Sequence, residues 1–195
     1  LELMDETEIR HLFDNLKEKY GRDIFGQGYL YKIISFDEIA CVNEITEEEK
    51  TKGIKKTNPH FVPYDKGDKD GNRWYLETPF YIDWSRESVE KLSTSPRARW
   101  QGYSFFFKEG FCWNNVLNPN AILIKCRLKS KSVNDVASMS LYPATDTVTT
   151  RYLVCLINSF FQFNYLRTFI NNTVNVQIND IRQLPIIIPN SQQLI

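Results

Sequence analysis

Residues 103–116, YSFFFKEGFCWNNV, indicate how the middle of the chain folds. Two runs rich in aromatic residues, Tyr103–Lys108 and Phe111–Val116, are separated by Glu109-Gly110, and this pattern predicts a β-hairpin. We expect a third strand at Ile122–Leu128, which is again rich in branched apolar residues. The middle of the chain is therefore expected to form a mixed, mostly antiparallel sheet.

Further extended segments are expected on both sides of this hairpin. Arg73–Trp84 alternates aromatic and polar residues, which predicts two strands separated at Pro79. Phe61–Tyr64 is expected to be an edge strand, because Pro63 cannot donate a ladder hydrogen bond. The remaining expected strands are Gly28–Phe36, Glu38–Val42, Val174–Ile178 and Pro185–Pro189.

Helices are expected at both ends of the chain. Asp5–Tyr20 has apolar residues at helical spacing, and Thr147–Ile170 is apolar enough to predict a long buried helix with Phe161 in the core. Shorter helices are expected at Thr46–Lys56, where Thr46 and Glu49 form a capping box, and at Ser85–Leu92. The predicted fold class is α+β, with a mostly antiparallel sheet in the middle, an N-terminal helix and a long C-terminal buried helix.

The composition is that of a globular protein with a substantial core. The chain has 195 residues, of which 42% are hydrophobic and 14% aromatic, which excludes a disordered chain. The net charge is zero, but residues 1–50 hold 6 Lys and Arg against 13 Asp and Glu, whereas residues 51–195 hold 18 against 11. We expect an acidic lead-in at residues 1–60 and a functional domain at residues 61–195, or one continuous domain.

The cysteines and the apolar segments predict a cytoplasmic protein. Cys41, Cys112, Cys126 and Cys155 form no Cys-x-x-Cys pair, so we expect no metal site. Three of them, Cys112, Cys126 and Cys155, have apolar neighbours and are expected to be buried reduced thiols. Six polar residues interrupt the most apolar stretch, Tyr152–Ile170, so we expect no membrane span.

Motifs for catalysis are weak, and we expect no catalytic, cofactor-binding or metal-binding residue in this chain. Phe25-Gly26-Gln27-Gly28 and Asn58-Pro59-His60-Phe61 resemble two loops of amino-methyltransferases. The first follows a polar helix instead of a buried strand, and His60 replaces a rigid proline. Asp37, Glu48 and Lys50 have the spacing of a metal-dependent nuclease, but they are expected on an exposed helix start. A nuclease fragment that uses these three residues remains an alternative.

Basic residues interleaved with aromatic ones form three groups, around Arg73-Trp74, around Trp100 and around Lys125–Lys131. Lys and Arg bind phosphates, whereas Arg, Asn and Gln can also read base edges. The alternative interpretation is that these groups are solvated faces over an aromatic core. The candidate DNA-binding residues are Lys66, Lys69, Asn72, Arg73, Arg97, Arg99, Gln101, Lys129 and Lys131.

A series of short blocks from Phe61 to the C-terminus resembles one enzyme family. The blocks are Phe61-Val62-Pro63-Tyr64-Asp65-Lys66-Gly67 with Asn72-Arg73-Trp74-Tyr75, Tyr81-Ile82-Asp83-Trp84, Phe107-Lys108-Glu109-Gly110-Phe111-Cys112-Trp113, Leu156-Ile157-Asn158-Ser159-Phe160, and Gln177-Ile178-Asn179-Asp180-Ile181 with Leu184-Pro185-Ile186. In order and spacing they are similar to the C-terminal target-recognition region, the TaqI-type specificity region, of type II restriction–modification adenine methyltransferases.

This resemblance implies a module that recognises a sequence in double-stranded DNA and is itself non-catalytic. It also implies an upstream methyltransferase domain on the same chain, which transfers a methyl group from S-adenosylmethionine to an adenine. An endonuclease that uses Mg²⁺ can be part of such an enzyme, so the parent is expected to be a site-specific methyltransferase with or without nuclease activity. No cofactor is expected in this part of the chain. The alternative function is a protein–protein interaction scaffold that uses the aromatic surface.

Overall fold

In the computed structural model, the structure describes residues 7, 8, 10–12, 14, 15, 34–68, 72–77, 80–96, 100, 102–135 and 138–188. The chain divides into two units, Leu1–Phe36 and Asp37–Ile195, and each is described by itself. The described residues between 7 and 15 are helical, which agrees with the expected N-terminal helix. The strand expected at Gly28–Phe36 lies mostly outside the described residues, and Phe36 begins a short 3-10 helix, η1 (Phe36–Glu38).

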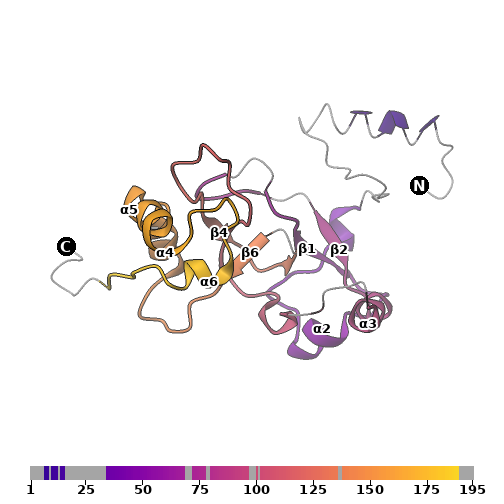
Figure 1. The fold of residues 1–195 in the computed structure, drawn as a ribbon. Helices are drawn as coiled ribbons and strands as arrows, with labels where there is room; N and C mark the ends of the chain where they lie inside the picture. Colours follow the sequence, from indigo (N-terminus) through magenta and orange to yellow (C-terminus); the bar gives the residue numbers. More distant parts are fainter. Residues whose placement is uncertain are drawn as a thin grey trace. The chain divides into compact units, whose positions relative to one another are not determined.

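The second unit has an α+β fold built on two small sheets (Figure 1). The first sheet has the order β2-β1-β5, with β1 (Phe61–Asp65) antiparallel to β2 (Tyr81–Asp83) and parallel to β5 (Val133–Asn134). The second sheet is antiparallel, with the order β4-β3-β6. Its strands are β3 (Gly110–Asn114), β4 (Arg127–Lys129) and β6 (Ser138–Leu141).

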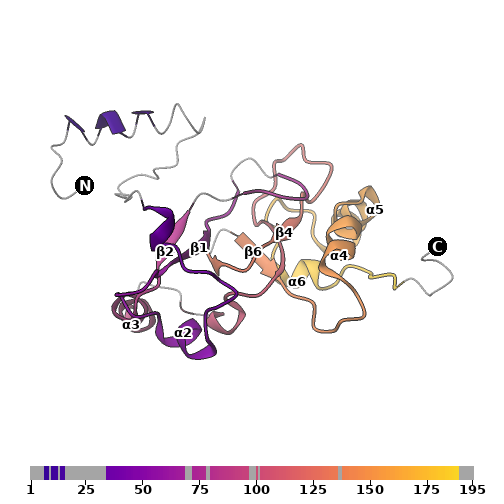
Figure 2. The same cartoon turned by 180° about the vertical axis from the view of Figure 1, so that it is seen from behind.

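Two capped helices cover the first sheet. α2 (Glu47–Lys52) begins at Thr46, whose side chain accepts from the Glu49 N–H while the Glu49 carboxylate accepts from the Thr46 N–H, so the expected capping box is confirmed. α3 (Arg86–Thr94) has Ser85 as its N-cap residue, at the expected start of this helix. Their core is centred on the buried Trp84, whose indole N–H donates to the Glu49 carbonyl at 3.0 Å. Figure 2 shows the same end of the unit from behind.

The second sheet is covered by helices from the C-terminal part of the chain. They are α4 (Thr150–Ile157), α5 (Phe160–Tyr165), the π-helical turn η3 (Leu166–Ile170) and α6 (Ile178–Ile181). Their core contains the buried side chains of Trp113, Ile157 and Leu166. The single long helix expected at Thr147–Ile170 is wrong, because Asn158 ends α4 and the Ser159 hydroxyl caps α5 by accepting from the Gln162 N–H.

Several segments that were expected to be strands have a different structure or a different place in their sheet. Tyr103–Lys108 is not a strand but contains the 3-10 helix η2 (Tyr103–Phe105), after which Phe106 and Phe107 turn into the core against Trp84. β1 is the middle strand of its sheet, not an edge strand. Pro63 is tolerated there because ladder bonds involve alternate residues: Tyr64 donates to Phe80 at 2.9 Å. Glu38–Val42 forms only a bridge at Ile39, and the described residues 185–188 are not a strand.

The boundary between the two units lies between residues 36 and 37. The reason is packing: Ala40, Ile45 and Ile54 are buried in the same core as Trp84. The expected functional domain at residues 61–195, or one continuous domain, stays a prediction. Cys112 and Cys126 are buried as expected, but Cys155 is exposed, because it lies on the outward side of α4. Phe161 is also exposed, and its neighbour Phe163 is the buried ring. Within the described residues, no helix is both long and apolar enough to span a bilayer.

Candidate functional site

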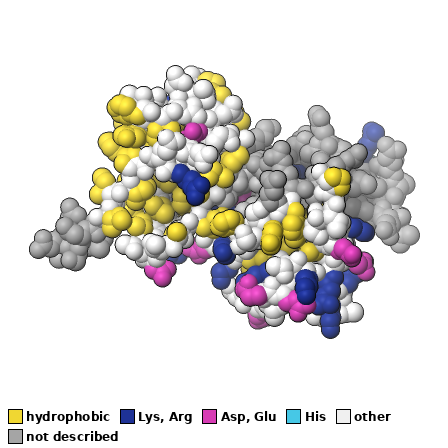
Figure 3. All heavy atoms as spheres, turned by 60° about the horizontal axis from the view of Figure 1, so that its bottom comes forward, with side chains coloured by type: hydrophobic (Ala, Val, Ile, Leu, Met, Phe, Trp, Pro, Cys, Tyr) yellow, Lys and Arg dark blue, Asp and Glu magenta, His cyan; other side chains and the backbone are white. Residues whose placement is uncertain are grey.

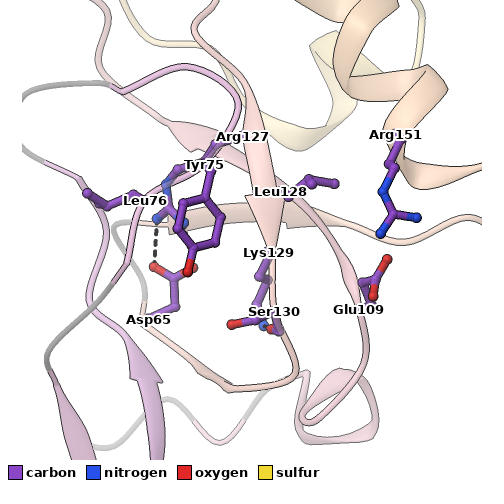
Figure 4. A pocket seen from close by; sticks show the side chains of 9 residues that line it. All are labelled: Asp65, Tyr75, Leu76, Glu109, Arg127, Leu128, Lys129, Ser130 and Arg151. Carbon is purple, nitrogen blue, oxygen red and sulfur yellow. Dashed lines mark hydrogen bonds and ion pairs between the residues drawn. The ribbon is translucent and has the colours of Figure 1, made fainter.

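A buried ion pair connects the two sheets. Asp65 ends β1 and Arg127 begins β4, and the Arg127 guanidinium donates to both carboxylate oxygens, with Nη2 2.8 Å from Oδ1 and Nη1 3.2 Å from Oδ2 (Figure 4). Both side chains are only 4% exposed. The Gly67 N–H donates to Oδ1 at 3.1 Å, and the positive φ of Gly67 (85°) lets the chain turn over the carboxylate. A bidentate pair of this kind adds geometric specificity to the junction between the two sheets.

The surroundings of this pair perturb three titratable groups. Burial acts to raise the pKa of Asp65, but the Arg127 guanidinium outweighs it and holds that pKa below its usual value. Burial raises the pKa of the Cys112 thiol to about 12, and lowers the pKa of Lys129 to about 8. The Lys129 ammonium is fully buried and donates to the Ser132 hydroxyl at 2.8 Å and to the Ser130 and Ser132 carbonyls.

The segment Arg73-Trp74-Tyr75, here called the Trp74 platform, lies along β4. The Trp74 N–H donates to the Cys126 carbonyl at 3.1 Å, and the Leu128 N–H donates to the Trp74 carbonyl at 2.8 Å. Trp74 adopts a positive φ of 72°, which is uncommon for an aromatic residue and turns the segment here. The Arg73 guanidinium carbon lies 4.7 Å from the centre of the Trp74 ring. The Trp74 and Tyr75 side chains are 45% and 64% exposed.

Asn158 supports the platform from the helical side. Its side-chain oxygen accepts from the Cys126 N–H at 2.9 Å, and its amide nitrogen donates to the Cys126 carbonyl at 2.6 Å. The Cys126 carbonyl therefore receives bonds from both Asn158 and Trp74. The Asn-Ser pair of the resemblance thus has a local role here: Asn158 fixes the chain before β4, and Ser159 starts α5.

The turn before the platform is closed by a buried carboxylate. Asp68 accepts from the backbone and side-chain N–H groups of Asn72, the latter at 2.9 Å. The Asp68 N–H donates to Asn114 at the end of β3, and the Asn114 amide donates back to the Asp68 carbonyl. One amide donor of Asn72 is therefore engaged in holding the turn in place.

A small cavity of about 140 Å³ opens beside the platform. Figure 4 shows Tyr75 and Leu76 on one side of it, Arg127 and Lys129 on the strand, and Arg151 of α4 pointing toward Glu109. The wall is rich in cationic groups, but Arg127 and Lys129 are already bound to protein acceptors. We therefore treat the exposed platform, and not this cavity, as the candidate site.

The structure brings two of the three basic groups together. The group around Arg73-Trp74 and the group at Lys125–Lys131 meet through the bridge between Trp74 and Arg127. Lys66 is partly exposed, with its ammonium 5.4 Å from the Phe80 ring centre, and Lys131 is exposed and donates to the Asn43 side chain at 2.8 Å. Lys69, Arg97, Arg99 and Gln101 lie outside the described residues. Trp100, from the remaining group, stacks on Trp84 in the first core.

Lys129 is placed differently from the other candidates. The sequence analysis grouped the basic residues at Lys125–Lys131 and named Lys129 as a candidate DNA-binding residue. In the structure Arg127 and Lys129 turn inward, toward Asp65 and Ser132. Sequence reasoning also missed Asp65, Asp68 and Asn158 as the residues that hold the site. For Asn158 the signal was a polar residue inside an apolar run, whereas Asp65 and Asp68 lie in a charged segment that gave no signal of their burial.

The residues of the nuclease alternative are engaged on the surface of the first sheet's helices. Glu48 lies 3.4 Å from Lys52 and 3.9 Å from Arg86, and the Lys50 ammonium lies 2.5 Å from Glu47. Asp37 is exposed in η1. In the described part of the chain, no group of three or more His, Cys, Asp or Glu residues is arranged to hold a metal ion.

Comparison with known proteins gives no further assignment. No protein-family model matches the chain, and no curated protein matches it.

Proposed function

We propose that this chain is a sequence-specific DNA-recognition module. The observation that carries the proposal is the Trp74 platform: an arginine stacked on an exposed tryptophan, fixed along β4 next to a second basic group. Arginine beside an aromatic ring suits DNA, because the guanidinium can donate two hydrogen bonds to guanine while the ring limits the entropy lost on binding. The parent would then be a type II adenine methyltransferase, with or without an endonuclease.

The charged groups divide into two roles in this proposal. Arg73 reads a base edge, since its guanidinium lies 4.7 Å from the centre of the exposed Trp74 ring, which holds it at the surface. Lys66, Lys125 and Lys131 are outside the core, and they bind phosphates and set the register of the module on the duplex. Arg127 holds the two sheets together instead, because its guanidinium already binds Asp65. Lys129 holds the turn after β4, because its ammonium already binds Ser130 and Ser132.

The proposal places the methyl-transfer chemistry outside this chain. S-adenosylmethionine would be bound by an upstream methyltransferase domain, and Mg²⁺ by a nuclease where one is present. Isothermal titration of the 195-residue chain with S-adenosylmethionine is therefore expected to show no micromolar binding. Micromolar binding would mean that the chain carries a cofactor site of its own, and would contradict this division.

The test of the function itself is DNA binding by the 195-residue chain. Selection from a pool of random duplexes should enrich a defined sequence, and affinity for that duplex should fall steeply as salt rises, with a log–log slope of about −0.9 per phosphate contact. A protein–protein scaffold would enrich no sequence. Binding to DNA without enrichment of any sequence, or an affinity that does not change with salt, would contradict the proposal that this chain recognises a DNA sequence.

A further inference from the structure

An unusually apolar surface covers α5 and η3. Phe161, Tyr165 and Phe169 are spaced four residues apart, and their ring centres are separated by 6.2 and 5.0 Å along the helix. Phe161 is 57% exposed and Phe169 is 72% exposed. The π-helical turn is closed by the Asn171 N–H, which donates to the Leu166 carbonyl at 2.8 Å, five residues back. Turns of this kind are rare and are often found at functional sites.

The chain after α6 extends this surface. The Gln162 amide donates to the Pro185 carbonyl at 2.6 Å, and the Tyr152 hydroxyl donates to the Ile187 carbonyl at 2.5 Å, so this segment is tied to α4 and α5. Figure 3 shows hydrophobic side chains gathered over the part of the unit that carries these helices. We call the combined surface the aromatic face; its exposed residues are Phe160, Phe161, Phe169, Ile186, Ile187 and Ile188, with the partly buried Tyr165 between them.

The aromatic face carries almost no charge. Between Phe160 and Ile170 the only ionisable side chains are Tyr165 and Arg167. The Arg167 guanidinium lies 5.3 Å from the Phe163 ring centre and donates to the Thr173 carbonyl, so part of its hydrogen-bonding capacity is already engaged. Between Phe160 and Ile170 a charged partner would meet only this one cationic group. A membrane is also a poor fit, since helices that lie on bilayers carry several Lys or Arg residues beside the apolar face.

The size of the face matches what a dimer needs. An aromatic side chain presents roughly 150–250 Å², so the exposed fractions of the three phenylalanines and three isoleucines amount to several hundred Å². Two such faces would bury on the order of 1,000 Å² or more together, close to the lower end for stable interfaces. An apolar patch of several hundred Å² is about as large as the largest patch on a typical monomer, and such patches often mark interaction sites.

We propose that two copies of this chain associate through the aromatic face about a two-fold axis near Tyr165. The i, i+4, i+8 spacing makes the face self-complementary when two helices pack antiparallel. Phe161 of one copy then lies opposite Phe169 of the second copy, and the reverse, while the two Tyr165 rings meet at the axis. This inference uses residues remote from the Trp74 platform and stands whether or not the chain binds DNA.

Sedimentation velocity over a concentration series tests the association. The mass of the wild-type chain should rise from 23.0 kDa toward twice that value. Phe161→Lys and Phe169→Glu should each remain monomeric, because each places charges against the opposing ring. Tyr81→Asp is the matched control, since Tyr81 is an exposed aromatic on β2, at the other end of the unit in both Figures 1 and 2, and it should associate like the wild type.

An equimolar mixture of the two monomeric variants tests the antiparallel geometry. In a mixed dimer Lys at position 161 faces Glu at position 169, and the two remaining phenylalanines face each other, so the mixture should regain the dimer mass. Unchanged melting temperatures would show that the exposed substitutions leave the fold intact. The proposal is overturned if the wild type keeps the monomer mass, if the variants associate like wild type, or if the mixture remains monomeric.

Discussion

Asn158 and Cys126 are joined by two reciprocal hydrogen bonds, although they lie in different elements 32 residues apart. The side-chain amide of Asn158 imitates the edge of a strand: it accepts from the Cys126 N–H at 2.9 Å and donates to the Cys126 carbonyl at 2.6 Å. The same carbonyl accepts from the Trp74 N–H on the other side. One buried asparagine thus links the end of α4, the start of β4 and the Trp74 platform.

Replacing Asn158 by alanine should therefore be costly. The change leaves the Cys126 N–H buried without its acceptor, and a buried unsatisfied group costs about 1–3 kcal/mol. We expect the free energy of unfolding, measured by urea denaturation, to fall by at least about 2 kcal/mol when the lost packing is included. Asn179→Ala, an exposed asparagine in α6, should change it by less than about 0.5 kcal/mol. Equal stabilities for the two variants would contradict the role of Asn158.

The Asp65–Arg127 pair should behave as a unit. Removing one partner, as in Asp65→Leu or Arg127→Met, leaves the charge of the other partner buried and uncompensated, and should cost about 3–5 kcal/mol. The double variant Asp65→Leu/Arg127→Met removes both charges and should be less destabilised than the sum of the singles. Urea unfolding of all variants gives this coupling directly. Additive losses would show that the two side chains act independently.

Lys129 should make stability depend on alkaline pH. Burial lowers its pKa from 10.5 to about 8, so between these values the unfolded chain holds a proton that the folded chain has released. Because the unfolded state then binds more protons, the Lys129 contribution to the free energy of unfolding rises with pH, on the order of 1 kcal/mol per pH unit.

The Cys112 thiol acts in the opposite direction above pH 9, since burial raises its pKa from 9.0 to about 12. The measurement is therefore the difference in unfolding free energy between wild type and Lys129→Met from pH 8 to pH 10.5, with both chains carrying Cys112→Ser so that the thiol does not titrate. This difference should grow in favour of the wild type as pH rises. A flat difference for Lys129→Met would show that its ammonium stays protonated.

Two neighbouring phenylalanines of α5 should respond differently to alanine. Phe163 is buried against Leu166 and the rest of the second core, so Phe163→Ala should cost about 3–5 kcal/mol. Phe161 is exposed, and Phe161→Ala should cost less than about 1 kcal/mol at concentrations where the chain is monomeric. Thermal unfolding at low protein concentration measures the stability of each variant and distinguishes these two losses. A larger loss of stability for Phe161→Ala than for Phe163→Ala would mean that Phe161, and not Phe163, packs in the core.

The sequence predicted those elements whose signals are local. The capping box of Thr46 with Glu49 and the Ser85 cap gave two helices, and the run at Phe111 gave β3. The sequence-based prediction failed where the local structure depends on contacts with residues far away in the chain. Tyr103–Lys108 has strand composition, but Phe106 and Phe107 gain more by packing on Trp84 than by pairing. The helix break at Asn158 depends on Cys126, which no local pattern reveals.

The same division applies to the candidate site. The Arg73-Trp74 pair was recognised from composition, because basic residues beside aromatics are informative without knowledge of the fold. The inward orientation of Arg127 and Lys129 was not predicted from the sequence, since their acceptors, Asp65 and Ser132, come from other strands or turns. Alternate positions on a strand share one face, but the sequence pattern does not say which face is buried when both carry polar residues.

The central claim is that the Trp74 platform reads DNA, and one set of titrations tests it most directly. Affinity is measured for the selected duplex and a scrambled duplex, across salt, for wild type, Arg73→Ala, Lys66→Ala and Lys91→Ala. Lys91 is an exposed lysine on α3 and serves as the charge-matched control. Arg73→Ala should lose about 1–3 kcal/mol on the selected duplex and little on the scrambled one.

In the same titrations Lys66→Ala should weaken binding to both duplexes equally and lower the salt slope by about one, and Lys91→Ala should match the wild type. We expect the ratio of affinities for the two duplexes to collapse only in Arg73→Ala. If Arg73→Ala keeps the wild-type ratio and affinity, as Lys91→Ala is expected to do, the Trp74 platform is not the DNA-reading surface.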